Sequence, residues 1–351
     1  MNVSPLADDP GSIVAGRLDG LTDPAVRDLA WLLFSPGLLR EQLPLAPLAT
    51  PWAHADEALA AARWLSRLDR DPAPLRDALE RAHLTRLGRY AEALLGWFLA
   101  FGPAARLVAA SVPLRQAGRT LGECDFLLES SEGRRLHWEL AVKCYLHAGG
   151  PDAMLADFVG PNLRDRFDRK RAHLVNRQMR LSASEEFASL GYAGPWLAQM
   201  FVKGWLFYRE GAGAQVVQGE PPELAPDHAR GWWVTRSDWP AFAAQQRAAG
   251  WSELPRLAWL APRRLDVRRA GAVEGAGETP VEGTAAGGPS GPGAVAPPVD
   301  PDVLFDHVLR RDEPVMVVAF AANGAAGYAE QSRGFIVPDD WPARAQAFAR
   351  D

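Results

Sequence analysis

Residues Gly122–Leu146, which read GECDFLLESSEGRRLHWELAVKCYL, are the stretch that decides the fold. Apolar residues alternate with polar ones on both sides of the polar break ESSEGR, and this pattern is typical of two strands joined by a tight turn. A three-residue loop would put Gly133 in the left-handed conformation that such loops favour. The same loop fixes the pairing of the strands and places Asp125 opposite Glu139.

This pairing gives the hairpin two different faces. One face is apolar throughout and is expected in the core; it carries Cys124, Phe126, Leu128, Trp138, Leu140 and Val142. The other face is largely charged and carries Glu123, Asp125, Leu127, His137, Glu139, Ala141 and Lys143. A slip of one residue would mix the two sets, which supports the predicted register.

The charged face raises a question of electrostatics. Residues directly opposite on paired strands have Cβ atoms about 5 Å apart, so Asp125 and Glu139 would repel each other unless a cation or a proton lies between them. A divalent metal would satisfy both groups, since hard cations take oxygen ligands. A solvated strand face of mixed charge accounts for the same residues without a metal. Both interpretations stay open at this point.

An Asp on one strand, followed by a carboxylate and a lysine on the next, resembles the PD-(D/E)XK nuclease superfamily, which has the restriction-endonuclease-like fold. The resemblance implies that Asp125 binds metal and that Lys143 is the lysine of the family's acidic-X-Lys triplet. The acidic position of the triplet is Ala141 in this chain. We expect Glu139, about 6.6 Å earlier along the strand, or Glu123, opposite Ala141, to supply the missing carboxylate.

The resemblance extends beyond the hairpin. The superfamily often adds a glutamate from the preceding helix, and LGRYAEALLGWFL offers Glu92, for which a helix-surface position is the alternative. Four stretches, LGRYAEALLGWFLA, RTLGECDFLL, LHWELAVKCYLH and FVGPNLRDRFDRKRAHLVNRQMRLS, resemble an uncharacterised bacterial family, domain of unknown function 1853, which is grouped with that nuclease fold. The implied catalytic residues are Asp125, Glu139 and Lys143. The implied ligands of Mg²⁺ or Mn²⁺ are Asp125, Glu139, Glu123 and Glu92.

A basic segment follows the hairpin, against the acidic background of the chain. The candidate contacts to a nucleic-acid backbone are Arg164, Arg166, Arg169, Lys170 and Arg177, and Asp165 and Asp168 oppose them. An exposed helix with internal pairs such as Asp165–Arg169 is the alternative. Gln178 is expected to point toward the charged face. His137 and His147 have no cysteine or histidine partner at ligand spacing, so no zinc site is expected.

The hydrophobic pattern predicts an α/β fold: a restriction-endonuclease-like core, that is, a mixed β-sheet flanked by helices, with a helical N-terminal region and additional C-terminal strands. The predicted parts are a helical region at 1–110, the core at 111–268, a disordered Gly/Pro/Ala-rich insertion at 269–298, and strands with a helix at 299–351. Strands are expected at 200–209, 231–236, 257–264, 314–322 and 334–338. Asp23, Asp238 and Asp340 are expected to cap helices that begin with proline.

Composition narrows the classes of function. The net charge of −5 argues against a protein that coats nucleic acid without selectivity, although one local basic groove remains possible. Two cysteines, no signal-peptide pattern at the start and no uninterrupted apolar stretch favour a cytoplasmic protein outside the membrane. The sequence does not define the oligomeric state. Three classes of function remain: a metal-dependent nuclease, a degenerate relative that binds nucleic acid or protein without cutting, and a different enzyme or structural protein.

Overall fold

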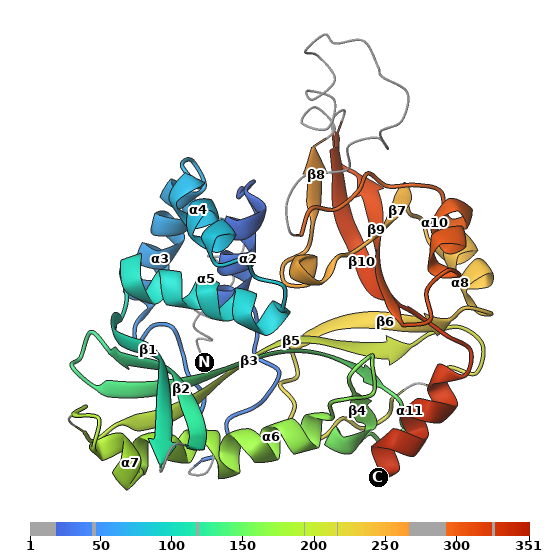
Figure 1. The fold of residues 1–351 in the computed structure, drawn as a ribbon. Coiled ribbons are helices and arrows are strands. Elements are labelled where there is room, and N and C mark those ends of the chain that lie inside the picture. Colours follow the sequence, from blue (N-terminus) through green and yellow to red (C-terminus); the bar gives the residue numbers. More distant parts are fainter. Residues whose placement is uncertain are drawn as a thin grey trace, which may run out of the picture.

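The computed structural model describes residues 19–43, 47–116, 119–192, 194–215, 217–266, 293–324 and 327–351 (Figure 1). Its α-helices are α2 (Pro24–Phe34), α3 (Ala55–Leu68), α4 (Ala73–Arg81), α5 (Leu87–Phe101), α6 (Phe167–Asn176), α7 (Glu185–Ala188), α8 (Trp239–Gln245), α10 (Pro301–Val308) and α11 (Trp341–Arg350). Three short 3₁₀ helices are η1 (Leu155–Asp157), η2 (Gln178–Ala183) and η3 (Arg256–Ala258). The strands are β1 (Arg106–Gln116), β2 (Arg119–Glu129), β3 (Arg135–His147), β4 (Phe158–Val159), β5 (Leu197–Arg209), β6 (Ala229–Thr235), β7 (Gly250–Glu253), β8 (Arg264–Asp266), β9 (Val315–Ala322) and β10 (Gly327–Val337).

One mixed sheet joins the strands in the order β1-β2-β3-β5-β6-β10-β9-β7, with β4 beside β3 and β8 beside β10. The strands β1, β2 and β3 form an antiparallel meander. The strand β5 runs parallel to β3, and β6 and β10 continue the parallel part. Because α6 lies between β3 and β5 in the chain, it provides the crossover that a parallel pair requires. The expected mixed α/β sheet flanked by helices is confirmed.

The N-terminal helices cover one face of the meander. Side chains of α2 to α5 pack with Phe126, Leu128, Trp138 and Leu140 in one apolar cluster (Figure 1). The first helix begins as the sequence predicts, because the Asp23 carboxylate accepts hydrogen bonds from the N–H groups at positions 25 and 26, each at 3.0 Å. The opposite face is covered by α6, η2 and α7 (Figure 1). The strands β2 and β3 are therefore covered by helices on both faces, whereas most residues of the edge strand β1 are exposed.

The C-terminal part extends the same sheet. In Figure 1, β9 and β10 turn away from the plane of β3 and β5, with α8 and α10 packed against them. The helix α11 returns to the first half of the chain, where the Trp341 indole N–H donates to the Pro161 carbonyl at 2.8 Å. Residues 341–350 are thereby attached to the segment that leads into α6.

Several expectations about the elements need correction. The strand β1 begins at Arg106, inside the region that was expected to be helical up to 110. Of the strand expected at 257–264, most belongs to η3 and the turn after it, and β8 begins only at its last residue. Asp238 and Asp340 stand at the starts of α8 and α11, but neither makes a side-chain capping bond; the Asp238 carboxylate instead accepts from the Thr235 hydroxyl at 2.8 Å.

The insertion expected at 269–298 lies outside the described residues from 269 to 292. Its last part is ordered and belongs to the fold: Val295 packs in an apolar cluster, and the Ser252 hydroxyl donates to the Ala296 carbonyl at 2.9 Å. The prediction of disorder is therefore wrong for 293–298. Among the helices in the described part of the chain, none combines the length and the apolar character that crossing a membrane would require.

Candidate metal centre

The hairpin has the register that the sequence predicts. The four neighbouring pairs next to the turn are Phe126–Trp138, Leu127–His137, Leu128–Leu136 and Glu129–Arg135. Gly133 has a φ of +75° and supplies the left-handed residue of the loop. The turn and the alternation of the strands therefore determine the register together, as expected.

Beyond Phe126 the two strands of the hairpin separate, so the predicted pairs Asp125–Glu139 and Glu123–Ala141 do not form. The strand β2 continues to pair with β1 as far as Arg119, while β3 continues to pair with β5 as far as Leu146. We call this opening between β2 and β3 the fork. The 3₁₀ helix η2 contacts β2, β3 and β5, and the Leu181 side chain lies against Gly122, where a Cβ atom would approach its Cδ1 to 2.9 Å. The charged face of the hairpin therefore opens into the fork.

Asp125 lies where the fork begins. Its Oδ2 accepts a hydrogen bond from the N–H of Leu140 at 2.9 Å, so the carboxylate replaces the backbone partner that the ladder no longer provides. Burial and then the negative charge of Glu139 raise the pKa of Asp125 to about 8, and Glu92 adds to the rise. The Leu140 N–H and the charge of Lys170 act in the opposite direction. The repulsion expected between Asp125 and Glu139 is therefore present in the folded protein.

Glu139 is fully buried, and both of its oxygens are hydrogen-bonded. Its Oε1 lies 2.6 Å from Nε2 of His137, and its Oε2 accepts from the Gln178 amide at 2.8 Å. The expectation that Gln178 points toward the charged face is confirmed. Because the other ring nitrogen of His137 lies 3.0 Å from the Ser182 hydroxyl, η2 holds this whole chain of polar groups in place.

Glu92 and Glu123 lie on the more exposed side of the fork. One guanidinium joins them, since Nη1 of Arg89 is 2.6 Å from Glu92 and 3.3 Å from Glu123. Burial is the main reason that the pKa of Glu92 is raised; Arg89 opposes this rise, whereas the charges of Glu123 and Glu139 add to it. The four carboxyl groups, from α5, β2 and β3, are therefore close enough for their charges to affect one another.

Two lysines belong to the site. Lys143 forms an ion pair with Asp165, whose Oδ2 also accepts from the Tyr145 hydroxyl at 3.1 Å. Burial and the charge of Lys143 lower the pKa of Lys170, while Asp125, Asp165 and Glu139 attract its proton. The sequence interpretation assigned the catalytic lysine to position 143 and a backbone contact to position 170. In the structure, Lys170 is the lysine whose charge acts on Asp125.

Ala141 occupies the position where the resembled family has an acid. Its side chain is buried in an apolar cluster with Tyr145, Phe167 and Met200, beneath α6. A carboxylate at this position would be surrounded by apolar groups, at a high desolvation cost. Position 141 is therefore unsuited to a carboxylate in this fold.

The basic segment divides into engaged and exposed residues. The Arg166 guanidinium bonds to Asp168 at 2.7 Å and to the Ala349 carbonyl at 2.9 Å, so it holds α11. Arg177 donates to the Leu121 carbonyl at 2.7 Å and connects η2 to β2. Arg164 and Arg169 are exposed, although the latter guanidinium also lies over the Phe348 ring. The helix pair expected between Asp165 and Arg169 does not form, because Asp165 binds Lys143 instead.

Cys124 lies on the opposite face from the one expected. It packs with Val112, Leu127 and Leu181 rather than with Phe126. The strand pair β2–β3 ends at Phe126–Trp138, so pairing with β3 no longer fixes the face on which Cys124 lies. The Cys124 thiol therefore points toward His137 and Glu139, and the ligand atoms of these three residues all lie within 4.8 Å of one another. Spacing in the sequence could not show this convergence.

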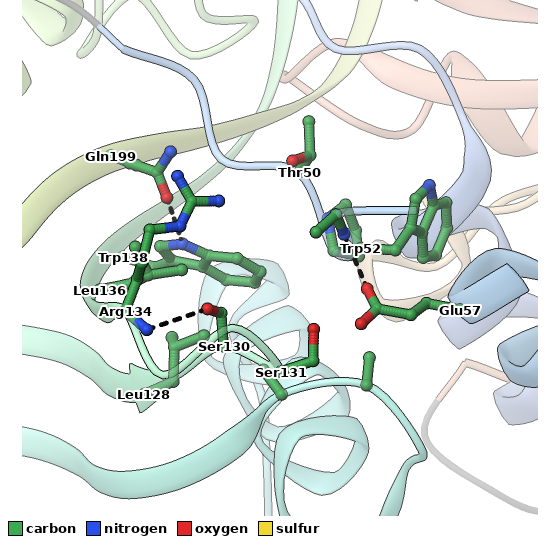
Figure 2. Close-up of a pocket in the computed structure, with 14 residues that line it drawn as sticks. Thr50, Trp52, Glu57, Leu128, Ser130, Ser131, Arg134, Leu136, Trp138 and Gln199 are labelled. Atoms are coloured by element: carbon green, nitrogen blue, oxygen red, sulfur yellow. Dashed lines mark hydrogen bonds between the residues drawn. The ribbon is translucent and has the colours of Figure 1, made fainter. Parts of the chain in front are cut away.

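A small hollow lies on the other face of the hairpin (Figure 2). Trp138 borders it, and the indole N–H of this residue donates to the Gln199 side chain at 2.9 Å; Ser130 and Glu57 lie nearby. Its volume of about 40 Å³ leaves room for water but not for a nucleotide. The carboxylates of the fork, rather than this hollow, are therefore the candidate site.

The fold and the site together define a class: a mixed-sheet α/β protein with a carboxylate and lysine centre in a fork between two strands. The chain belongs to the family described as Domain of unknown function (DUF1853), whose sequence pattern matches residues 27–337. This range includes the meander, the crossover helix and the C-terminal strands. No curated protein and no solved structure matches the chain.

Proposed function

We propose that this protein is a metal-dependent phosphodiesterase of the nuclease type, with DNA or RNA as its substrate and Mg²⁺ or Mn²⁺ as its cofactor. The observation that carries the proposal is the arrangement of four acidic side chains around the fork: Glu92 and Glu123 share Arg89, Asp125 accepts from the Leu140 N–H, and Glu139 is buried beside His137. Burial and the charges of Glu139 and Glu92 raise the pKa of Asp125 to about 8, which supports it. Strongly perturbed carboxyl groups held together by a rigid scaffold are typical of functional sites. The arrangement also agrees with the resemblance to PD-(D/E)XK nucleases, since an Asp and a Glu on adjacent strands meet a glutamate from the preceding helix.

The donor chemistry of the four carboxylates suits a divalent cation. Glu92, Glu123, Asp125 and Glu139 offer oxygen ligands, the donor type that Mg²⁺ and Mn²⁺ prefer. Their exposure decreases inward: the side chains of Glu123 and Glu92 are 35% and 24% exposed, and that of Glu139 is 1% exposed. A cation could therefore reach the carboxylates from the side of Glu123. Binding of positive charge would also offset the burial and the repulsion that together raise the pKa of Asp125.

The side chains of the fork suggest a division of roles. When bound, the metal would supply a water of lowered pKa and would stabilise negative charge on phosphate. The ammonium of Lys170, which acts on Asp125, is placed to orient a water or to neutralise charge that develops on the phosphate. Lys143 is the second candidate for this role; its ion pair with Asp165, whose carboxylate also accepts from the Tyr145 hydroxyl, fixes its position. Arg164 and Arg169 provide exposed positive charge for a substrate backbone.

The second candidate function is binding without cleavage. One observation favours it: Glu139 already uses both oxygens in hydrogen bonds to His137 and Gln178. Two hydrogen bonds inside the protein are enough to explain this carboxylate as a structural group, without a metal. In that case the exposed arginines would still bind nucleic acid, but no hydrolysis would follow.

Calorimetry with Mg²⁺ and Mn²⁺, followed by cleavage assays on single- and double-stranded DNA and RNA, tests the proposal. Asp125→Asn and Glu139→Gln keep the shape of each side chain, and both should abolish metal binding and cleavage. Glu129→Gln is the matched control, because Glu129 lies on the same strand as Asp125, near the turn of the hairpin, and forms an ion pair with Arg106.

A second pair of variants distinguishes the roles of the two lysines. Lys170→Met and Lys143→Met should leave metal binding intact, and the variant that loses cleavage identifies the catalytic lysine. If wild type binds neither metal and cuts no substrate, the nuclease proposal is refuted. Nucleic-acid binding that then weakens in Arg164→Glu with Arg169→Glu would establish the second candidate instead.

A further inference from the structure

Three side chains of different chemistry meet at the closed end of the fork. Cys124 comes from β2, and His137 and Glu139 come from the same face of β3. Each is buried, with exposed fractions of 0%, 0% and 1%. Their ligand atoms lie within 4.8 Å of one another, and Nε2 of His137 is 2.6 Å from Oε1 of Glu139. Sulfur, imidazole nitrogen and carboxylate oxygen together are the donor set that zinc takes in proteins.

The distances leave room for an ion after a small adjustment. Tetrahedral zinc has bonds of about 2.0–2.1 Å to nitrogen and oxygen and about 2.3 Å to sulfur, so its ligand atoms lie roughly 3.3–3.8 Å apart. The contact between His137 and Glu139 would widen by less than about 1 Å, and the thiol would move inward by a similar amount. The fork permits this movement, since the backbone ladder between β2 and β3 ends at Phe126–Trp138.

The surrounding groups support ligation. A metal-binding histidine usually has its other ring nitrogen hydrogen-bonded, and here Nδ1 of His137 faces the Ser182 hydroxyl at 3.0 Å. A hydroxyl can donate or accept, so Ser182 can serve His137 in either tautomer. In the metal-bound form the ring proton would sit on Nδ1 and leave Nε2 free to bind. The Gln178 amide holds the other oxygen of Glu139 at 2.8 Å and so fixes the carboxylate plane.

We infer that Cys124, His137 and Glu139 form a Zn²⁺ site, distinct from the Mg²⁺ site but sharing Glu139 with it. As the Zn–S bond forms, the Cys124 thiol loses its proton to solvent, and no electron is transferred. The ion connects β2 to β3 where their backbone bonds end. Because Zn²⁺ would engage Oε1 of Glu139, a carboxylate that the Mg²⁺ site also uses, zinc antagonises Mg²⁺ at the carboxylates. The site itself does not depend on nuclease activity, since two of its three ligands lie outside the carboxylate set.

Cobalt provides the direct test, because a thiolate bound to Co²⁺ gives an intense near-ultraviolet charge-transfer band. Wild type should show this band on titration with Co²⁺ and lose it when Zn²⁺ is added. Cys124→Ser should lack the band and should weaken Zn²⁺ binding by more than about 100-fold, beyond the cost of losing a residue that only supports a ligand. Cys144→Ala is the matched control, because Cys144 is the other buried cysteine and lies in a different cluster.

The zinc inference and the nuclease proposal can fail separately. Asp125→Asn should keep the cobalt band and lose Mg²⁺ binding. Cys124→Ser should lose the cobalt band and keep Mg²⁺ binding. Absence of the band in folded wild type overturns the zinc site without need of any variant. A band that survives in Cys124→Ser overturns it as well, because another sulfur would then be the ligand.

Discussion

The carboxyl of Asp125 should make the folded protein less stable as pH rises. Burial and the charge of Glu139 raise its pKa from an ordinary 3.8 to about 8. Between these values the folded state keeps a proton that the unfolded chain has lost. Stability therefore falls with pH, because it decreases wherever the folded state binds more protons than the unfolded state.

The size of the effect follows from the pH interval. Each pH unit in this window removes about 1.4 kcal/mol, so the free energy of unfolding should fall by up to roughly 4 kcal/mol between pH 5 and pH 8. This is an upper figure, since water that enters the fork on ionisation would relieve part of the penalty. Asp125→Asn cannot ionise, and its amide oxygen can still accept from the Leu140 N–H. The variant should match wild type near pH 5 and exceed it by several kcal/mol at pH 8.

Urea denaturation of both proteins at half-unit pH steps, in chelator, measures this difference. Asp77→Asn is a suitable control, because Asp77 is exposed on α4. Adding Mg²⁺ at pH 8 should then restore wild type, by about 2.7 kcal/mol when the free ion is about 100 times its Kd, and should leave Asp125→Asn unchanged. Parallel stability curves for wild type and Asp125→Asn across this range would show that the electrostatic reasoning about the fork is wrong.

Three further predictions concern the scaffold. Gly204→Ala should lower the free energy of unfolding by more than about 3 kcal/mol, because φ is +148° and the new Cβ would lie 1.7 Å from the Lys143 carbonyl oxygen. As the control, Gly88→Ala, on open helix surface, should raise it by about 0.5–1 kcal/mol. Asp28→Ala should cost about 3–5 kcal/mol, since the buried carboxylate holds Arg263 at 2.7 Å and the Tyr90 hydroxyl at 2.9 Å; a change below 1 kcal/mol would contradict this. Replacing residues 270–290 with a short Gly/Ser linker should alter the free energy of unfolding by less than about 1 kcal/mol. Val295→Ala should lower it by about 1.5 kcal/mol. If thermal melts show a larger loss of stability for the linker variant than for Val295→Ala, the boundary of the insertion is misplaced.

The turn of the hairpin and the pairing beside it could be predicted from the sequence, because both depend on residues that are close together in the chain. Gly133 sets the loop, and the alternation of side chains sets which strand positions face each other. The prediction failed at Cys124, which lies beyond Phe126–Trp138, where the ladder between β2 and β3 ends. Alternation therefore predicts the facing of side chains only where the two strands stay paired.

The partners within the site were harder to predict than its carboxylates. The charge interaction of Asp125 with Glu139 was expected, although the strand pair that was predicted to produce it does not form. Gln178 was correctly expected to face the site, where it bonds to Glu139. The pairing of Lys143 with Asp165 was missed, because it depends on how the chain turns before α6 and not on helical spacing. The zinc donor set was missed for the same reason: Cys124 and His137 are adjacent only after the strands separate.

The order of strands in the sheet has a consequence for synthesis of the chain on the ribosome. The strand β10 lies between β6 and β9, and it pairs with β6 through Phe335–Trp233 and its neighbours. At about 5–20 residues per second, β6 is made roughly 5–20 s before its partner on that side. During this interval its edge has no intramolecular strand to complete it, and the tryptophan-rich segment 231–235 is open to pairing with other chains. The nascent protein is therefore expected to need chaperone protection most during the delay between these two strands.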